Sequence, residues 1–490
     1  MFKKVLVANR GEIACRIFRT LHKLGIGSVA VYHHADRAAP HVALAEQAIE
    51  LSGAVPTAAY LDHEQIVAAA GQSGAEAIHP GYGFLSENAA FAGFVADAGL
   101  TFIGPDADSI RLMGDKIGSR NFAKAQGVPI APSVTPQGDL AAFVAAAEAI
   151  GFPLLIKASA GGGGKGMKIA RSAAELAENA KLAQSEAERY FRDGRIYAER
   201  LVEQPRHIEV QVLGDGTGNV VHLYERECSI QRRYQKIIEE APAANLPTGL
   251  RDEICAAAVR LASAAKYKNA GTIEFVLAPD GTFFFLEMNT RLQVEHPVTE
   301  AILGIDLVAE QLRVAAGLGL SFTQDQLVPR GHAIECRICA EEPEKDFRPA
   351  TGKIGRLHIP KGGGLRFDGG IRQGQEVTPA FDSMLAKLIA HGPNRVVTAA
   401  RLAAALDELV ILGVKVNADY LARILRHPAF LEGRLHTGFV AEHAASLAAP
   451  PLPPGLEAAL LAAAALGDKD FRRSAFGVPE PHASIGPWRN

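Results

Sequence analysis

Several features that would point to other classes of protein are scarce or missing in this sequence. Five cysteines occur in 490 residues, which argues against a disulfide framework and for a reducing, cytoplasmic compartment. The net charge is −3, so we do not expect a broad nucleic-acid surface. No apolar run is long enough to span a bilayer, and a strand-like run begins at Lys3, so we expect neither a membrane span nor a signal peptide. The length suits about two to four globular domains.

Two widespread phosphate-binding motifs are also absent. The first strand-like run is followed by Gly11, but the full dinucleotide fingerprint Gly-x-Gly-x-x-Gly is missing there. Residues 161–166 are Gly-Gly-Gly-Gly-Lys-Gly. They do not form a Walker A motif, because no Ser or Thr follows the lysine and a strand is expected next. A glycine loop between two strands can still donate backbone N–H groups to phosphates and act as a lid. A plain flexible hairpin is the alternative.

Alternating strand-like and helix-like segments divide the chain into regions. From residue 3 to 112 they follow the pattern of a parallel α/β domain. Residues 131–203 contain strands and one helix and look like a small inserted unit. A larger, strand-rich α+β region follows as far as residue 446. The proline-rich run at 450–454 predicts a linker, after which come an alanine-rich helix and a loose end.

Polar and apolar side chains alternate from residue 287 to residue 295. The polar members of this run are Glu287, Asn289, Arg291, Gln293 and Glu295. Because a strand points alternate side chains to opposite faces, an extended chain would line these five up on one side. The common explanation is an amphipathic strand with its polar face in water, but this face has no Lys, Ser or Thr of the usual solvated kind. The run therefore indicates a metal and anion site.

A predicted hairpin brings a further carboxylate to this run. Two β-rich segments flank Asp280 and Gly281, which is a strong hairpin signal. If these two residues form the loop, Glu274 lies directly opposite Glu287. Facing carboxylates destabilise a bare sheet, but they suit a divalent cation between them. Two carboxylates and the amide of Asn289 are suitable ligands for Mg²⁺ or Mn²⁺, with phosphates completing the shell.

Other polar residues are weak indicators by themselves. Lys116 and Lys157 could each reach a phosphate, although a lone lysine is more often a solvated surface charge. Glu199 and Val202 lie at a strand end, where a hinge could offer a hydrogen-bond acceptor and a backbone N–H to a nucleotide base. Polar side chains alternate with apolar ones from His207 onward, which puts three polar groups on one face. Residues 227–236 bring cations and amides together. A run of charged residues exposed to solvent would show the same pattern.

Five motifs together resemble biotin carboxylase, a family of the ATP-grasp superfamily. They are residues 9–14, 79–88, 161–167, 231–233 and 287–297. The similarity extends from residue 2 to about residue 446. It implies an α/β and α+β fold with an N-terminal parallel α/β (pre-ATP-grasp) domain, an ATP-grasp lid and body, and a C-terminal biotin carboxylase domain. The implied bounds are 1–112, 113–330 with the lid at about 131–203, 331–446, and a linker or tail at 447–490.

The resemblance also implies roles for individual residues. The implied catalytic residues are Glu295 as general base, Arg337 as the residue that steadies the biotin enolate, Arg291 and Lys236. The positions implied to bind ATP are Lys116, Lys157, Gly162, Gly163, Gly164, Lys165, Gly166, Met167, Glu199, Val202, His207, Gln231, Tyr234 and Lys236. The implied bicarbonate ligands are Arg291, Gln293, Glu295 and the backbone N–H of Val294. Biotin is implied at Arg337, and Mg²⁺ or Mn²⁺ at Glu274, Glu287 and Asn289.

The implied activity is the carboxylation of biotin by ATP and bicarbonate through carboxyphosphate. This is the first half-reaction of a biotin-dependent carboxylase, and an acyl-CoA carboxylase is the type expected here. Biotin is a substrate, and no Ala/Val-Met-Lys-Met motif occurs, so we expect it on a separate carrier domain or protein. The other implied partner is a carboxyltransferase subunit within an oligomer. Another ATP-grasp ligase, or a non-catalytic nucleotide-binding scaffold that recruits a carboxyltransferase, are the alternatives.

The sequence departs from the family pattern at a few positions. Tyr234 stands where the family usually has a histidine near the nucleotide. Lys23 and Gly363 stand where free-standing bacterial enzymes commonly have an acid and an aromatic residue at their dimer interface, although Arg19 and Arg366 are retained. These departures argue against that bacterial dimer. The tail beyond residue 446 resembles the start of the linker in α subunits of propionyl- or methylcrotonyl-type acyl-CoA carboxylases.

Overall fold

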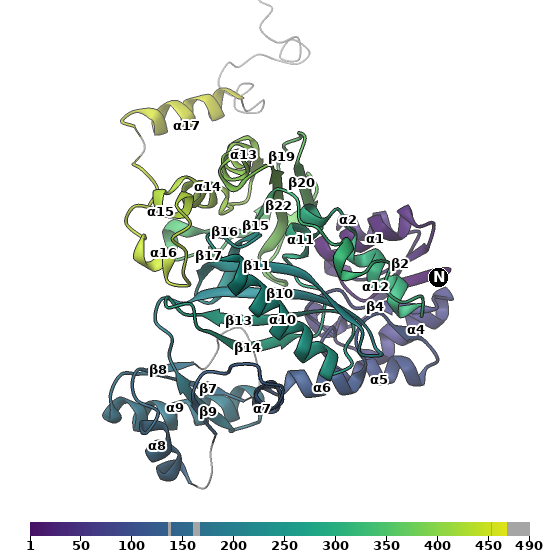
Figure 1. The fold of residues 1–490 in the computed structure, drawn as a ribbon. Helices are drawn as coiled ribbons and strands as arrows, with labels where there is room; N and C mark the ends of the chain where they lie inside the picture. Colours follow the sequence, from purple (N-terminus) through teal and green to yellow (C-terminus); the bar gives the residue numbers. More distant parts are fainter. Residues whose placement is uncertain (136–138, 160–166, 452, 468–490) are drawn as a thin grey trace, which may run out of the picture. The chain divides into compact units, whose positions relative to one another are not determined.

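The computed structural model describes residues 1–135, 139–159, 167–451 and 453–467 (Figure 1). The chain divides into two compact units, Met1–Leu447 and Ala448–Asn490. In the described part of the second unit, helix α17 (Leu456–Gly467) exposes leucine side chains such as Leu460 and Leu461. Among the described residues, no helix combines the length and the apolar character needed to cross a membrane. The first unit contains the three larger sheets and the candidate site.

Five parallel strands form the N-terminal sheet, in the order β3-β2-β1-β4-β5. They are β1 (Lys4–Val7), β2 (Gly27–His33), β3 (Gln47–Leu51), β4 (Ala77–His79) and β5 (Thr101–Phe102). The helices of this region are α1 (Gly11–Lys23), η1 (His34–Asp36), α2 (Pro40–Leu44), α3 (Pro56–Ala59), α4 (His63–Ser73), α5 (Ala89–Asp97) and α6 (Ala107–Gly114). Parallel neighbours need crossover connections, and the alternating pattern of the sequence indicated them. The predicted parallel α/β fold is confirmed.

A four-stranded antiparallel sheet follows, in the order β6-β9-β7-β8. Its strands are β6 (Ser133–Val134), β7 (Leu154–Ala158), β8 (Lys168–Ala170) and β9 (Ile196–Arg200). Helix α7 (Lys116–Ala125) precedes it, and α8 (Leu140–Glu148) and α9 (Ala173–Phe191) belong to it. Leu176, Ala180, Ala183 and Ala187 recur every three or four residues along α9 and are buried against the strands, because this spacing makes one face of a helix.

The largest sheet has eight antiparallel strands in the order β14-β13-β10-β11-β12-β15-β22-β20. They are β10 (Arg206–Asp215), β11 (Val220–Arg232), β12 (Gln235–Ala241), β13 (Lys268–Leu277), β14 (Phe283–Asn289), β15 (His332–Cys339), β20 (Leu365–Gly369) and β22 (Met384–Gly392). Since β12 pairs directly with β15, this sheet continues across residue 330, where the sequence predicted a domain boundary.

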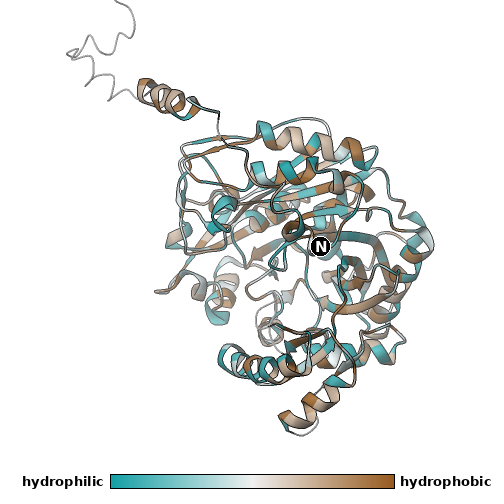
Figure 2. Cartoon of the chain, turned by 90° about the vertical axis from the view of Figure 1, so that its left-hand side faces the viewer, coloured by the Kyte–Doolittle hydropathy of each residue, from teal (hydrophilic) through white to brown (hydrophobic). Residues whose placement is uncertain are grey.

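Helices and short strands surround this sheet. The helices are α10 (Thr248–Ala264), α11 (His296–Leu303), α12 (Leu307–Ala315), η2 (Gln324–Gln326), η3 (Pro343–Lys345), α13 (Arg395–Glu408), α14 (Ala418–Arg426), α15 (Pro428–Leu431) and α16 (Phe439–Glu442). The short strands are β16 (Glu341–Glu342), β17 (Arg348–Pro349), β18 (Gly352–Lys353), β19 (Arg356–His358), β21 (Glu376–Val377) and β23 (Val410–Leu412). Figure 2 shows apolar and polar residues alternating along the helices, as expected for elements with one face on a core.

Strand β15 has one apolar and one polar face. Ile334, Cys336 and Ile338 are fully buried in a core that also contains side chains of α13 and α14. Glu335 and Arg337 alternate with them and therefore point to the opposite face. The candidate site lies on that opposite face.

The hairpin of β13 and β14 has the predicted pairing of Glu274 with Glu287, but its loop is one residue longer than predicted. Gly281 adopts a φ of 88° beside Asp280 in the loop, and the N–H of Ala278 donates to the carbonyl of Thr282 at 2.8 Å. Glu274 pairs with Glu287, as predicted, although the register shifts by one residue directly after Glu274.

The prediction of one extended run from 287 to 295 is wrong beyond Asn289, where β14 ends. The remaining residues of the run form a loop that leads into α11, so a single strand face does not align them. Side chains of this loop nevertheless contact the strands, since Gln293 donates to Glu274 at 3.4 Å and Glu295 accepts from Lys236 at 2.7 Å.

Candidate active site

Neighbouring strands of the eight-stranded sheet direct three carboxylates to one face. Glu209 on β10 pairs with Glu274 on β13, and Glu274 pairs with Glu287 on β14. Directly opposite residues of antiparallel strands point to the same side of the sheet. Arg226 on β11 lies opposite Glu209 on the other side. A row of three acids repels itself, so its stability depends on the cations around it.

The ammonium of Lys236, on β12, bridges these acids. Its Nζ lies 2.5 Å from Glu209 Oε2 and 2.8 Å from Glu274 Oε1. A third carboxylate, Glu295, contacts it at 2.7 Å through Oε1. Burial acts to lower the pKa of Lys236, but the three carboxylates raise this pKa well above its ordinary value. Lys236 is therefore a fixed positive charge in this state of the protein.

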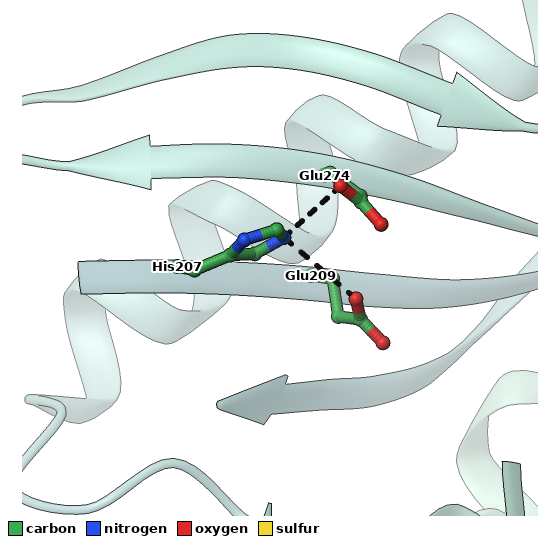
Figure 3. Close-up of side chains that lie close together, drawn as sticks. All are labelled: His207, Glu209 and Glu274. Atoms are coloured by element: carbon green, nitrogen blue, oxygen red, sulfur yellow. Dashed lines mark ion pairs between the residues drawn. The ribbon is translucent and has the colours of Figure 1, made fainter. Parts of the chain in front are cut away.

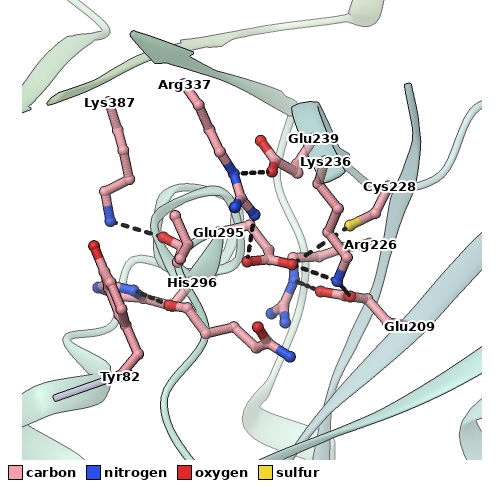
Figure 4. A network of polar contacts seen from close by, with 12 residues as sticks. Tyr82, Glu209, Arg226, Cys228, Lys236, Glu239, Glu295, His296, Arg337 and Lys387 are labelled. Carbon is pink, nitrogen blue, oxygen red and sulfur yellow. Dashed lines mark hydrogen bonds and ion pairs between the residues drawn. The ribbon is translucent and has the colours of Figure 1, made fainter. Parts of the chain in front are cut away.

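Glu295 lies between two cations (Figure 4). It is fully buried, and Arg337 Nη2 lies 3.1 Å from Oε2, the oxygen that Lys236 does not contact. Burial acts to raise the pKa of Glu295, but Lys236, Arg337 and Arg226 outweigh it and hold this pKa well below the ordinary carboxyl value. Glu295 is thus ionised. Its basicity would increase if Lys236 or Arg337 moved away from its carboxylate.

Two further buried acids lie beside Arg337. Glu239 on β12 accepts a hydrogen bond from Arg337 Nε at 2.5 Å. Burial, followed by the charge of Glu295, raises the pKa of Glu239 to about 7, although Arg337 acts in the other direction. Glu335 pairs with Glu239 across the strands, and neither of its buried oxygens has a hydrogen-bond partner. Burial raises the pKa of Glu335 well above its ordinary value.

The predicted metal ligands provide a suitable set of oxygens. Asn289 Nδ2 donates to Glu274 Oε1 at 2.8 Å, which places the amide beside the carboxylates. Burial and then the negative charge of Glu274 raise the pKa of Glu287, and a divalent cation would relieve this repulsion. The residues present therefore fit Mg²⁺ or Mn²⁺, which prefer oxygen ligands.

His207, Glu209 and Glu274 form a second group of potential metal ligands (Figure 3). His207 Nε2 lies 3.0 Å from Glu274 Oε2 and 3.9 Å from Glu209 Oε2. Gln231 shares a hydrogen bond with the other ring nitrogen of His207 at 2.9 Å. Because the ammonium of Lys236 contacts both acids, this group is held together without a metal ion.

The predicted bicarbonate residues surround the guanidinium of Arg291. Arg291 Nη1 donates to Gln293 Oε1 at 3.1 Å, and Nη2 donates to Asn289 Oδ1 at 3.0 Å. Its Nε donates to Glu87 at 2.8 Å. Glu87 belongs to the loop that follows β4, within the sequence motif at residues 79–88. The structure brings this loop to the site through Glu87.

On the nucleotide side, the structure joins Lys157 to Glu199. The two side chains form an ion pair at 2.5 Å, and Arg120 approaches the second oxygen of Glu199 at 2.8 Å. Lys116 lies 3.8 Å from Glu287, and burial lowers the pKa of Lys116. The two lysines thus flank the row of acids. The predicted loop residues Gly162, Gly163, Gly164, Lys165 and Gly166 lie outside the described residues.

The hairpin between β11 and β12 carries Tyr234. Both residues of its loop have positive φ angles, 49° for Arg233 and 65° for Tyr234, which non-glycine residues rarely adopt. Tyr234 is 54% exposed. Arg233 forms an ion pair with Asp346, and the guanidinium of Arg232 lies 4.7 Å from the ring centre of Phe347. These contacts hold the hairpin against the segment after η3.

One cavity of about 1530 Å³ connects these groups. With one exception, every predicted site residue that lies in the described ranges lines it, Met167, Val202 and Val294 included. The exception is Glu295, which is fully buried. The cavity is large enough for a nucleotide together with a small second substrate, and it brings together the lysines predicted to bind phosphate, the predicted metal ligands and the predicted bicarbonate residues.

Several residues of the site were not identified from the sequence. Arg226 is fully buried and donates to Glu209 at 2.6 Å and to Gln211 at 2.8 Å. Glu239 and Arg120 also contact predicted residues directly. Arg226 and Glu239 could have been found as candidates because each is a charged residue inside a β-rich run. Nothing in the local sequence of Arg120 distinguishes it from a surface arginine.

Comparison with known proteins gives three family matches along the chain. Residues 1–110 match the biotin carboxylase N-terminal domain. Residues 115–323 match the ATP-binding domain of the carbamoyl-phosphate synthase L chain. Residues 335–442 match the biotin carboxylase C-terminal domain.

Individual relatives match most of the chain. The chain is 48% identical over 446 residues to the biotin carboxylase of Nostoc sp., which covers 90% of this chain and 99% of that protein. It is 44% identical to the α subunit of methylcrotonoyl-CoA carboxylase of Dictyostelium discoideum, over 99% of this chain and 70% of that protein.

A solved structure matches as well. It is the biotin carboxylase domain dimer of the Hydrogenobacter thermophilus 2-oxoglutarate carboxylase, in complex with MgADP, ADP and bicarbonate. The two chains superpose with a TM-score of 0.89 at 45% identity, over 92% of this chain and all of the other.

Proposed function

This chain belongs to the biotin carboxylase family, and from that premise we propose that it carboxylates biotin with ATP and bicarbonate. The observation that carries the proposal is the position of Glu295, an ionised and fully buried acid between Lys236 and Arg337. One side of Glu295 faces the lysine expected at the phosphates, and the other faces the arginine expected at biotin. A single base between those two cations suits a reaction in which an anion first receives a phosphoryl group and then delivers carbon to biotin.

Bicarbonate becomes a good nucleophile only when a base takes its proton. In the proposed reaction Arg291 grips the planar anion through two parallel N–H groups, and Gln293 and the N–H of Val294 complete the site. Glu295 then accepts the proton as a bicarbonate oxygen attacks the γ-phosphorus of ATP. ADP leaves, and carboxyphosphate is formed. Lys236 supports this step by neutralising charge on the transferred phosphoryl group.

Carboxyphosphate yields CO₂ and phosphate, and the phosphate takes the proton from the ureido nitrogen of biotin. Arg337 stabilises the enolate that results, and CO₂ is captured by the nitrogen. A divalent cation held by Glu274, Glu287 and Asn289 would supply charge neutralisation at the ATP phosphates. The glycine-rich residues 162–166 remain predicted ATP ligands, whose role would be to keep water from the mixed anhydride.

The proposal extends to the domains and partners of the chain. We assign residues 1–112, 113–330 and 331–446 to the N-terminal, ATP-grasp and C-terminal domains, with a linker or tail beyond. Biotin reaches the site on a carrier domain or protein, and a carboxyltransferase uses the carboxybiotin. The methylcrotonoyl-CoA carboxylase α subunit among the relatives supports an acyl-CoA carboxylase. The five cysteines are unpaired, which supports a reducing, cytoplasmic location.

The decisive experiment measures release of phosphate from ATP with and without bicarbonate and free biotin. We expect cleavage that depends on bicarbonate and rises with biotin, together with formation of carboxybiotin. Cleavage that ignores both compounds would indicate another ATP-grasp ligase. Binding of ATP without any bicarbonate-dependent turnover would favour a nucleotide-binding scaffold.

Glu295→Gln tests the assignment of the base. We expect it to lower the bicarbonate-dependent rate by about 10²–10⁴-fold while ADP still binds with unchanged affinity. A matched loss of nucleotide binding would show that Glu295 has a different role.

A further inference from the structure

Lys387 is a fully buried lysine whose position the predicted chemistry does not explain. It lies on β22, directly opposite Arg337 of β15, on the polar face of the sheet. Like charges that face each other across two strands are destabilising, and a buried ammonium needs a partner. The neighbouring residues Ala386 and Leu388 point to the apolar core on the other face. Lys387 is therefore placed by contacts other than core packing.

Two contacts fix the ammonium of Lys387. Its Nζ donates to the backbone carbonyl of Val294 at 2.7 Å. It also lies 3.2 Å from Glu12 Oε1, a carboxylate in the first turn of α1. The other oxygen of Glu12 accepts a hydrogen bond from Tyr82 at 2.6 Å. Glu12 of the N-terminal region thus supplies the counter-charge. The ammonium of Lys387 donates to the loop that carries the proposed bicarbonate site (Figure 4).

The carbonyl of Val294 belongs to the peptide group that joins Val294 to Glu295. This loop follows the end of β14 at Asn289 and precedes α11, so no sheet ladder holds it. The preceding peptide is held at the carbonyl of Gln293, which contacts His296 Nδ1 at 2.7 Å. Lys387 holds the next peptide. Together these two contacts fix the plane of each peptide on either side of Val294, and with them the N–H proposed for bicarbonate.

We propose that Lys387 is a positioning residue for the bicarbonate site: its bond to the Val294 carbonyl fixes the peptide that leads into Glu295, directly after the peptide that bears the Val294 N–H. The inference rests on the proposed function. Lys387 does not line the cavity, so it would act through the loop and not on the anion itself. The competing explanation is that Lys387 only neutralises buried acids and so contributes to stability.

Two variants separate these explanations. Lys387→Met keeps the volume of the side chain but removes the donor and the charge. Lys387→Met combined with Glu12→Gln removes both charges of the pair, so no uncompensated carboxylate is left at that point. The matched control is Arg395→Met. Arg395 is also largely buried and pairs with Glu240 at 2.7 Å, but Glu240 points away from the site.

The readout is bicarbonate-dependent ATP cleavage over a range of bicarbonate and ATP concentrations, with ADP binding measured in parallel. Loss of a charged hydrogen bond that orients a binding loop predicts a rise of about tenfold or more in the KM for bicarbonate. The KM for ATP and the affinity for ADP are expected to stay unchanged. The control is expected to lower the melting temperature without changing the KM for bicarbonate.

The inference is overturned if the double variant binds ADP, cleaves ATP and has an unchanged KM for bicarbonate. It is also overturned if the control raises this KM as much as the Lys387 variants do. If Lys387→Met does not fold, the double variant decides alone. Failure of the proposed function is a separate result, because the unmodified protein would then show no dependence on bicarbonate.

Discussion

Replacing Glu239 with glutamine is expected to stabilise the protein at pH 8 and to change its stability little at pH 5. The pKa of Glu239 rises to about 7, mainly because the carboxyl is buried. In the unfolded chain this pKa returns to about 4.5, so between these two values the folded protein keeps a proton that the unfolded chain releases. The stability that Glu239 contributes is therefore fully present below the unfolded pKa and is lost as the pH rises through the folded pKa.

The size of the effect follows from the same shift. A gap between about 4.5 and about 7, at about 1.4 kcal/mol for each unit, corresponds to about 3 kcal/mol above pH 7. Glutamine is neutral at every pH and can still accept the hydrogen bond that Arg337 donates at 2.5 Å. The variant therefore avoids the buried negative charge while it keeps the guanidinium in place.

The assay is thermal unfolding of both proteins at several pH values between 5 and 8. The melting temperature of Glu239→Gln minus that of the unmodified protein is expected to be near zero at pH 5 and to reach several degrees at pH 8. Glu240→Gln is the matched control on the next residue. Burial acts to raise the pKa of Glu240, but His332 and Arg395 lower it, so this variant is expected to be destabilised at neutral pH. A difference for Glu239→Gln that stays constant with pH would refute the reasoning.

Three further outcomes are expected at the site. Arg337→Met should lower carboxybiotin formation by about 10²-fold or more while ADP binding persists, and an unchanged dependence on biotin would contradict the role of Arg337. Removal of divalent cations with a chelator should abolish ATP cleavage. Glu287→Gln should raise the Mg²⁺ concentration needed for half-maximal activity by about tenfold or more. An unchanged Mg²⁺ requirement would show that Glu287 is not a metal ligand. Tyr234→Ala should raise the KM for ATP severalfold but leave that for bicarbonate unchanged, and equal changes in both would argue against a contact with the nucleotide.

The facing carboxylates were predicted from the geometry of a short hairpin, but the structure pairs them with the help of a register shift that was not predicted. A two-residue loop at Asp280 and Gly281 would place Glu274 opposite Glu287. In the structure the loop is one residue longer, since Ala278 already bonds to Thr282, and the register shift after Glu274 restores the predicted pairing. The parallel N-terminal sheet was predictable for a related reason, since strands alternating with helices leave few other arrangements. The parallel sheet thus followed from local alternation, whereas the register shift in the hairpin had no signal in the local sequence.

The position of Glu295 could not be derived from alternation. The strand ends at Asn289, and beyond it each side chain points where tertiary contacts hold the loop. The resemblance to a family named Glu295, but its contacts with Lys236 and Arg337 depend on β12 and β15 being neighbours in the sheet. Local sequence carries no information about that pairing.

Residues that act through long-range contacts were missed for the same reason. Lys387 reaches Val294 and Glu12 across sequence separations that no local pattern spans. Arg120 looks like any helical surface arginine until the fold brings it to Glu199. Burial turns such ordinary charged residues into determinants of the site, and burial is a property of the whole fold.

The pairing of β12 with β15 has a consequence for dividing this chain into pieces. These strands lie on either side of residue 330, so a fragment that ended there would leave β12 with a row of unpaired N–H and C=O groups. Such an edge readily pairs with other chains and promotes aggregation. The same ladder holds side by side the strands that carry Lys236 and Arg337. A break at residue 330 would therefore also separate the strands whose cations contact Glu295.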